Sequence, residues 1–454
     1  MNYDAPHISE RIESAGMKTP RIRIDVYQLL ALLLLLSPIC CWSQEGLAPA
    51  APSQNQLAAN DLPLEEEAPI ETSQGAAGSV SSLDSLLNMA IRQSPKLSVQ
   101  RNKVNESQMR VMAAGLLPNP SIEVGRKKVS GGDSGPLLSV SQELPLNGAL
   151  GFERQAAGWE YNAQQATLAR EIQMVLAEVQ SAFIHVLAAG NLLAIEQEGV
   201  AIAGQSLKLV SDTLKAGLVS TLPYNLAQAE YANSRAFEVI AQKEYQLAQE
   251  SLAALLGIPL SGLDPVQGDL RASLLPAGWN GSQVRRSDLQ AADYRLRATQ
   301  AQVAAADRAR LPNPVIGYSR EEADETENFF SIGLEIPVFN TGRAAVQEKQ
   351  AVSGTAYAER QALSKEVQSE MAQAQTRLEA RRDAVRIYET EIEPSINLSL
   401  QAARAAFESG NTDLSLLLQT QNRLIEHKRN SIKSYEDLRK AEIEILLASG
   451  ATRN

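Results

Sequence analysis

Hydrophobic positions along the chain follow two spacings, and the same order of spacings occurs twice. Apolar residues recur every three to four positions over Leu83–Ile91 and again over Leu289–Ala309, which predicts helices. Each stretch is followed by two short stretches with a period of two, which predicts paired strands. The strand stretches are Ile122–Val124 with Leu138–Leu144, and Ile316–Tyr318 with Phe330–Ile336. The pattern therefore predicts a helix followed by a β-hairpin, stated twice, with four strands in all.

Three short motifs recur at nearly one offset, which shows that the chain contains a duplication. The pairs are Leu117–Pro120 with Leu311–Pro314 at an offset of 194, Ser141–Gly148 with Gly333–Gly342 at 192, and Lys215–Gly217 with Glu408–Gly410 at 193. Order and spacing are both kept, which chance matches rarely do. The Leu-Pro-Asn-Pro motif is expected to end the preceding helix, because proline lacks a donor and biases its predecessor out of the helical region.

Each predicted strand has one aliphatic face and one face of small or polar residues. Phe330, Ile332 and Leu334 alternate with Ser331 and Gly333. Polar loops are expected between the strands, over 126–135 and 320–328. A small sheet packed on helices is one interpretation, and the wall of a transmembrane barrel is the other. Four strands are too few for a membrane barrel, whose smallest bacterial examples have about eight, so strands that span a membrane require several chains in one barrel.

Long proline-free stretches follow each hairpin, from Pro145 to Pro223 and from Pro337 to Pro394. An unbroken helix of about 60 residues would extend for about 90 Å, and such rods pack as bundles. Three glycines are candidate breaks in the first stretch: Gly190, Gly199 and Gly204. Near the C-terminus one coiled-coil seam is predicted to have a partly hydrated face. Its apolar members are Leu414, Leu418, Ile425, Ile432, Tyr435 and Leu446, and its polar members are Gln421, Lys428, Arg439 and Glu442.

The N-terminal region has the pattern of a secretory signal peptide. Basic residues at 18, 21 and 23 precede the apolar run Leu29–Leu36, and cleavage is expected after Ser43, with Met17 as a possible start. The run is shorter than the roughly 20 residues of a spanning helix, although an inner-membrane anchor is the alternative. Acylation of Cys40 or Cys41 is a further alternative to simple cleavage. These residues therefore predict export from the cytoplasm.

The predicted segments follow in order along the chain. A signal peptide covers 1–43, and an Ala-, Pro- and Glu-rich leader without periodicity covers 44–78. The first repeat covers 79–270 with its hairpin at about 119–145, and the second covers 271–449 with its hairpin at about 313–338.

Composition excludes several functional classes. Of 454 residues, 44% are hydrophobic but only 5% aromatic, which suits extended helix packing better than a compact enzyme. The net charge of -11 argues against a nucleic-acid partner. After cleavage only His185 and His427 would remain as histidines, and neither lies in a metal-binding or catalytic motif. No catalytic residue, cofactor or metal site is predicted.

At Leu117–Pro120, Gln142–Leu146 and Lys215–Ser220 the chain resembles the TolC-like outer membrane efflux family, and the resemblance extends over about 80–450. It implies a mainly α fold with a β-barrel portion, in which a homotrimer forms a 12-stranded outer-membrane barrel continued by a coiled-coil barrel of long helices in the periplasm. It also implies a passive duct rather than an enzyme, fed by an inner-membrane pump of the RND type through a periplasmic adaptor (membrane fusion protein).

Among branches of that family, the Leu-Pro-Asn-Pro and Glu-Leu-Pro-Leu pattern is most similar to the CzcC-like, heavy-metal branch. Metal cations or small toxic compounds are the implied cargo. A periplasmic helical scaffold or adaptor without a membrane barrel is the alternative, but a duplication 193 residues apart is not expected in it.

The third motif resembles the turn at the periplasmic tip of the family. Residues implied to contact the adaptor are Gly217, Leu218, Val219, Ser220, Gly410, Asn411, Thr412 and Asp413. Acids expected near a closed aperture, where acidic rings select cations, are Asp212, Glu408 and Asp413. The first copy departs from the family pattern, because it has Pro223 and no aspartate. For any one of these acids, solvated surface charge is the alternative role.

Overall fold

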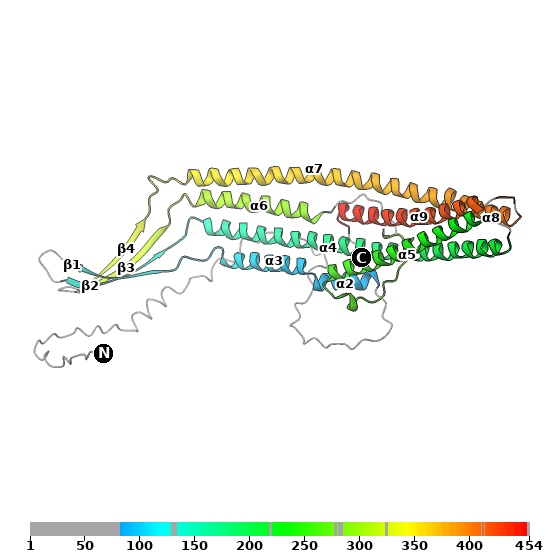
Figure 1. Cartoon of the computed structure of the whole chain (residues 1–454). Coiled ribbons are helices and arrows are strands. Elements are labelled where there is room, and N and C mark those ends of the chain that lie inside the picture. Colours follow the sequence, from blue (N-terminus) through cyan, green and yellow to red (C-terminus); the bar gives the residue numbers. More distant parts are fainter. Residues whose placement is uncertain are drawn as a thin grey trace, which may run out of the picture. The chain divides into compact units, whose positions relative to one another are not determined.

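The computed structural model describes residues 82–128, 134–217, 220–276, 279, 285–322, 326–409, 411–412 and 414–451. All of them belong to the compact unit Ala76–Asn454 (Figure 1). The predicted signal peptide and leader lie outside the described residues.

Helices and strands alternate in two similar series. The first contains α2 (Leu83–Gln93), α3 (Pro95–Ala113), β1 (Ser121–Lys128), β2 (Ser134–Glu143), α4 (Ala149–Lys215) and α5 (Thr221–Leu256). After the short 3-10 turn Leu260–Gly262, the second contains α6 (Ser287–Arg308), β3 (Pro314–Glu322), β4 (Thr326–Leu334), α7 (Arg343–Ile387), a π-helical turn (Tyr388–Ile392), α8 (Glu393–Glu408) and α9 (Leu414–Ser449). The predicted mainly helical fold with four strands is confirmed.

The first predicted helix is split in two. Its apolar positions Leu83, Leu86, Leu87 and Ala90 are buried in α2, whose N-terminus is capped by the side chain of Ser82. The backbone turns extended at Ser94, and Pro95 begins α3. Proline fits the first turn of a helix, where no N–H partner is needed, so this residue starts a second helix instead of interrupting one.

Helix α4 packs against α2, α3, α5, α6 and α9. Its 67 residues continue unbroken through the three glycines that were candidate breaks. A side chain at Gly190 would meet the ring of Tyr245, and one at Gly199 would meet Ile425. The glycines therefore allow neighbouring helices to approach closely.

Among the described residues, α4 alone contains a stretch apolar enough to pass for a membrane-spanning helix, with a mean hydropathy of 1.5. More than half of that stretch is buried in the bundle. Its composition is thus explained by packing, since a helix with neighbours on several sides is apolar on most of its faces.

The helix after the second hairpin contains a π-helical turn at Tyr388–Ile392. Pro394 lies in the next turn and cannot donate a backbone hydrogen bond. The chain accommodates the proline by widening this turn and continuing as α8, so α7 and α8 form one extended rod with a local irregularity.

The four strands form one antiparallel sheet in the order β1-β2-β3-β4. Pairing continues further than the predicted loops allowed: Lys128 lies opposite Ser134, and Glu322 lies opposite Thr326. The expected loops over 126–135 and 320–328 were therefore too long. Charged residues near the turns were assigned to loops, although their backbones continue the ladder.

The C-terminal helix α9 corrects the predicted hydrated seam. Gln421, Arg439 and Glu442 are buried, whereas Lys428 remains partly exposed. Arg439 donates to Glu442 at 2.6 Å, and Glu442 also accepts hydrogen bonds from the hydroxyl of Ser273 and the backbone N–H of Leu274, both at 2.9 Å. Glu442 therefore holds the segment that joins the two repeats, whereas Gln421 and Lys428 contact Ser206 and Glu198 of α4.

Candidate functional site

The two faces of the sheet differ sharply in chemistry. Residues directly opposite each other share a face, and one cross-strand row contains Ile122, Val140, Tyr318 and Phe330. The next row, on the other face, contains Ser121, Ser141, Gly317 and Ser331. A Cβ on Gly317 would come within 2.6 Å of the Ser331 hydroxyl, so that face is closely packed. The sheet has an apolar face and a face of small residues.

The apolar face is uncovered within the chain. Ile332 is 80% exposed and Phe330 76%, and every residue of β4 is exposed. Among the described residues, β1 and β4 each pair on one side only. Both edges therefore present unpaired backbone N–H and C=O groups beside exposed aliphatic side chains. Such edges favour pairing with another strand.

The two proline-containing motifs meet where the sheet joins the helices. Asn313 accepts a hydrogen bond from the backbone N–H of Asn147 (3.2 Å) and donates to the carboxylate of Glu143 (2.9 Å). Asn147 in turn donates to the carbonyl of Leu311 (3.0 Å) and caps the start of α4 at Ala149. The second Leu-Pro-Asn-Pro copy is thus hydrogen-bonded to the first Glu-Leu-Pro copy, and we call this contact the clasp. Sequence reasoning found both motifs but not this contact.

The turn between α4 and α5 contains two of the residues predicted at the tip. Gly217 has a φ of 69°, a left-handed conformation that glycine adopts readily, and its N–H bonds to the carbonyl of Leu214. Ser220 precedes the first residue of α5, and Pro223 lies in the first turn, where proline is tolerated. The departure of this copy from the family pattern therefore still forms a helical hairpin. Leu218 and Val219 lie outside the described residues.

The matching turn between α8 and α9 lies at the same end of the bundle (Figure 1). The N–H of Asn411 bonds to the carbonyl of Ala406 at 2.9 Å, and Thr412 is half-buried. Gly410 and Asp413 lie outside the described residues, as does the side chain of Glu408.

A small apolar cluster packs the helices that flank the two turns against one another. Val210 and Ala227, from α4 and α5, pack with Phe407 of α8 and Leu418 of α9. Near it, Asp212 is exposed and lies 3.5 Å from Lys215. The structure therefore brings Gly217 and Ser220 to one end with Asn411 and Thr412. The carboxylate of Asp212 already has the ammonium group of Lys215 beside it.

Buried ion pairs strengthen the bundle between the sheet and the tip. Asp288, in the first turn of α6, lies 2.5 Å from Arg286 and 3.6 Å from Arg170 of α4, and Arg286 also pairs with Glu370 of α7. Burial works against the charged carboxylate, but hydrogen bonding to Arg286 outweighs it and lowers the pKa of Asp288. Three helices are thereby joined at one point, and the acid remains ionised.

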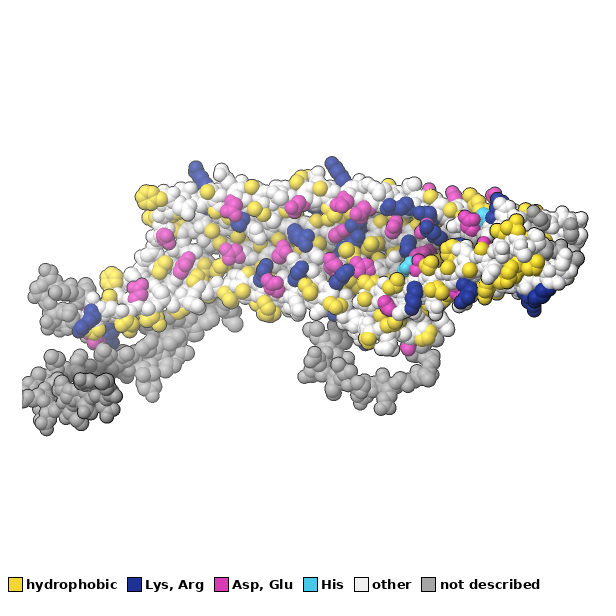
Figure 2. Space-filling model, viewed as in Figure 1, with side chains coloured by type: hydrophobic (Ala, Val, Ile, Leu, Met, Phe, Trp, Pro, Cys, Tyr) yellow, Lys and Arg dark blue, Asp and Glu magenta, His cyan; other side chains and the backbone are white. Residues whose placement is uncertain are grey.

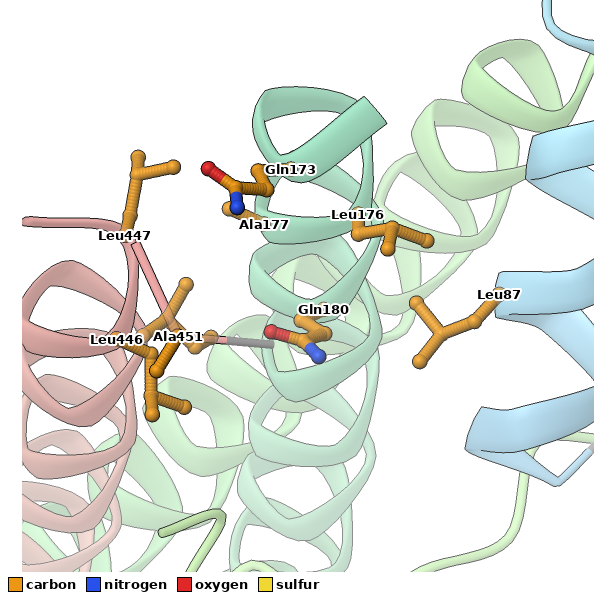
Figure 3. Close-up of a pocket in the computed structure, with 9 residues that line it drawn as sticks. Leu87, Gln173, Leu176, Ala177, Gln180, Leu446, Leu447 and Ala451 are labelled. Carbon is orange, nitrogen blue, oxygen red and sulfur yellow. The ribbon is translucent and has the colours of Figure 1, made fainter. Parts of the chain in front are cut away.

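Crevices between the helices differ in size: two open ones, between α4, α5 and α9 and between α3, α4 and α6, have volumes of about 300 and 370 Å³. The crevice in Figure 3 lies between α2, α4 and α9 and has a volume of about 30 Å³, room for about one water molecule. His185 pairs with Glu436 at 2.9 Å on the bundle surface, and His427 is half-buried in α9. Within the described ranges, no three side chains of His, Cys, Asp or Glu are grouped to hold a metal ion.

Comparison with known proteins gives a consistent result. The sequence profile of the family described as outer membrane efflux protein matches residues 86–258 and again 280–451. The chain is 25% identical over 301 residues to the pyoverdine export outer membrane protein OpmQ of Pseudomonas putida, covering 59% of this chain and 64% of that one. It therefore spans less than two thirds of the length of OpmQ.

A second relative and a solved structure are consistent with the match to this family. Over 365 residues the chain is 26% identical to the probable outer membrane lipoprotein SilC of Salmonella typhimurium, covering 74% of this chain and 76% of SilC. A crystal structure of CusC, described in terms of folding and transmembrane channel formation, superposes with a TM-score of 0.69 at 19% identity, covering 82% of this chain and 92% of CusC. At this identity, the superposition shows the shared fold.

Proposed function

The chain belongs to the outer membrane efflux protein family, and from this premise we propose that it is the outer-membrane exit duct of a tripartite efflux system. The match to the family profile confirms the family and the outer-membrane location that the sequence predicts. It is a family of channels, not of enzymes, and we propose that this chain has no catalytic step of its own. One observation carries the proposal: the sheet has an uncovered apolar face, a small polar face and two free edges.

A closed barrel made from several copies satisfies all three features of the sheet. The apolar face would contact lipid, the small polar face would line water, and each β4 edge would pair with the β1 edge of the next copy. Three copies give 12 strands, and the long helices would continue the channel into the periplasm. A scaffold or adaptor without a barrel would leave the apolar face in water.

The duplication predicts the register of that pairing. Inside the chain, Gln142 lies opposite Ile316. The offsets of 192 and 194 residues convert this pair to Leu334 of one copy opposite Ile122 of the next, and both residues lie on the apolar face. The same offsets place Asn119 beside Glu335 of the neighbouring copy, as Asn313 lies beside Glu143 within the chain.

At the other end, we propose that the two helical turns receive a periplasmic adaptor that connects the duct to an RND-type pump. The contact residues would be Gly217, Leu218, Val219, Ser220, Gly410, Asn411, Thr412 and Asp413. Replacing Thr412 with arginine should weaken adaptor binding and resistance while trimer yield and conductance stay unchanged. Loss of the trimer in that variant would assign the turn a structural role only.

The acids near the tip are proposed to favour cations. Asp212, Glu408 and Asp413 would form a ring when repeated by threefold symmetry, and acidic rings select cations. The ratio of cation to anion permeability should fall in Asp212→Asn. An unchanged ratio would leave Asp212 as a surface partner of Lys215, consistent with their 3.5 Å separation.

The central proposal is tested by fractionation and conductance. The protein should sediment with the outer membrane, and the purified oligomer should raise the conductance of a planar bilayer. A sample dissociated to monomers is the control and should not conduct, because four strands cannot close a barrel. Recovery only as a soluble periplasmic monomer contradicts the proposal.

The cargo class is tested with a deletion strain. Its sensitivity to cobalt, zinc, nickel and copper is compared with its sensitivity to dyes and antibiotics, and sensitivity to the metals alone would support the proposed heavy-metal branch.

A further inference from the structure

The end of the sheet farthest from the helices has opposite charges on its two faces. Arg126, Lys128 and Arg320 occupy register positions of the apolar face, where Glu322 is the acid. Figure 2 shows dark-blue basic side chains gathered at this end of the sheet. On the face of small residues, the same level carries three acids and one lysine: Glu123, Glu321, Glu327 and Lys127. Positive charge is thus concentrated on the face that would meet lipid.

The two arginines still have hydrogen-bond donors to offer. One Nη of Arg320 pairs with Glu322 at 2.7 Å, and the side chain remains 41% exposed, although its Nε is buried. Arg126 is exposed, and no ion pair to it is found in the described part of the chain. A ligand with several anionic oxygens could pair with the exposed guanidinium of Arg126 and with the exposed part of the Arg320 guanidinium.

This surface lies at the end of the apolar face. Strand β4 ends at Leu334, and beyond it the chain remains apolar and exposed at Ile336, Val338 and Phe339. From Leu334 to Asn328 the strand advances by about 20 Å at 3.3 Å per residue, which is about 15 Å along the membrane normal at a strand tilt of about 40°. The exposed apolar residues beyond Leu334 extend this surface toward the height of about 25 Å that is typical of the apolar band of outer-membrane barrels. Arg320 lies directly opposite Asn328, so it stands at the limit of the apolar face nearest the hairpin turns.

We propose that Arg126 and Arg320 form a rim that binds the phosphate groups of lipid headgroups in the leaflet around the hairpin turns. The inference rests on the proposed barrel, because only there does the apolar face meet lipid. The Cα atoms of Arg126 and Arg320 lie about 12 Å apart, from about 10 Å across two strand spacings and about 7 Å along the strand. Extended guanidinium groups at that separation can both reach one headgroup that carries two phosphates.

The test uses the full-length oligomer in detergent and measures lipid binding by native mass spectrometry. The probes are a bisphosphorylated glycolipid such as lipid A, its dephosphorylated form, and inorganic phosphate. Preferential binding of the phosphorylated lipid is expected. Equal binding of the dephosphorylated lipid would overturn the proposal, and inorganic phosphate that competes at the same concentration would show a site for free anions instead of lipid.

Neighbouring residues supply matched variants. Arg126→Gln should weaken binding of the phosphorylated lipid about fivefold, the usual effect of one basic residue at an anionic surface. Lys127→Gln removes the same charge one residue away, on the opposite face, and should leave binding unchanged. Glu322→Gln should strengthen binding, because it removes the acid that competes for Arg320. Equal losses in the first two variants, or no loss in either, would contradict the rim.

Bilayer conductance of every variant separates this inference from the proposed function. Conduction with no preference for phosphorylated lipid would refute the rim and keep the duct. Absence of conduction in the wild-type oligomer would refute the duct, whatever lipid it binds.

Discussion

The sheet and the middle of the helical bundle distribute the same kinds of residue in opposite ways. In the bundle Leu86 and Ile445 are almost fully buried, and the charges that accompany them are paired. In the sheet Val124 and Ile332 are each 80% exposed, while serines and a glycine lie close together on the other face. The bundle buries its apolar side chains, as a surface in water requires, whereas the sheet exposes them, as the proposed contact with lipid requires.

Whether an apolar side chain is exposed or buried depends on the solvent that its surface faces. Singly exposed apolar residues are ordinary on soluble proteins, but a contiguous uncovered face needs a partner. In the sheet this face is aligned by register across all four strands. The bundle needs no such partner for the residues of its core, because its helices cover one another.

The largest expected effect is in the bundle. Glu442→Gln should lower the free energy of unfolding by about 3–5 kcal/mol, because it leaves the buried Arg439 without its counter-ion. It also weakens the contacts to Ser273 and Leu274. The exposed pair of Lys96 and Glu178 is the control, and Lys96→Ala should cost at most about 1 kcal/mol. Denaturant titration of the detergent-solubilised oligomer measures both, and equal losses would contradict the assignment of a buried, structural ion pair.

A charge on the apolar face of the sheet ranks second. Ile332→Lys should destabilise the inserted protein by about 2–4 kcal/mol, the cost of lysine near the middle of a membrane. In water, the same substitution at an exposed site would change stability by only about 0.5 kcal/mol. Ser331→Lys, one residue away on the opposite face, should cost much less. Stability in lipid vesicles distinguishes the two environments, and similar values for both variants would place the apolar face in water.

These contrasts also show what the sequence could and could not predict. The strands, the duplication and the long helices follow from periodicity and proline positions, which are local signals. The burial of Arg439 and Glu442 does not, because a seam along one helix does not reveal the loop that covers it. The clasp of Asn313 on Glu143 joins residues 170 positions apart and needed the fold to bring them together. Charged residues near the hairpin turns favour loops in the sequence, but the ladder continues through them, because backbone pairing does not depend on side-chain polarity.

The clasp gives a third, smaller effect. Asn313→Ala removes hydrogen bonds to Asn147 and Glu143 and should cost about 1–2 kcal/mol within each protomer. Asn119→Ala, the equivalent change in the first repeat, should weaken association between copies instead. Unfolding of the dissociated chain and the temperature at which trimers dissociate separate these outcomes. If Asn119→Ala affects neither quantity, the equivalence of the two motifs is wrong.

Lowering the pH should produce the smallest change in stability. The folded-state pKa of Asp288 is lowered, so its pairing with Arg286 contributes fully above the ordinary value of 3.8 and is lost as the pH falls through the lower folded-state pKa. Wild-type stability should therefore decline below about pH 4, and Asp288→Asn should decline less steeply over that interval. Parallel pH profiles of the two proteins, obtained by denaturant titration, would show that this carboxylate contributes nothing.

Register-specific cross-linking between copies tests the shared barrel most directly. Cysteines placed at Ile122 and Leu334 are predicted to lie opposite each other across the seam, and mild oxidation should produce covalent trimers. Cysteines at Val124 and Leu334 occupy the same apolar face two residues out of register and should give little cross-linking. Equal yields from the two pairs, or disulfide formation within a single chain, would contradict a barrel closed by β1 of one copy and β4 of the next.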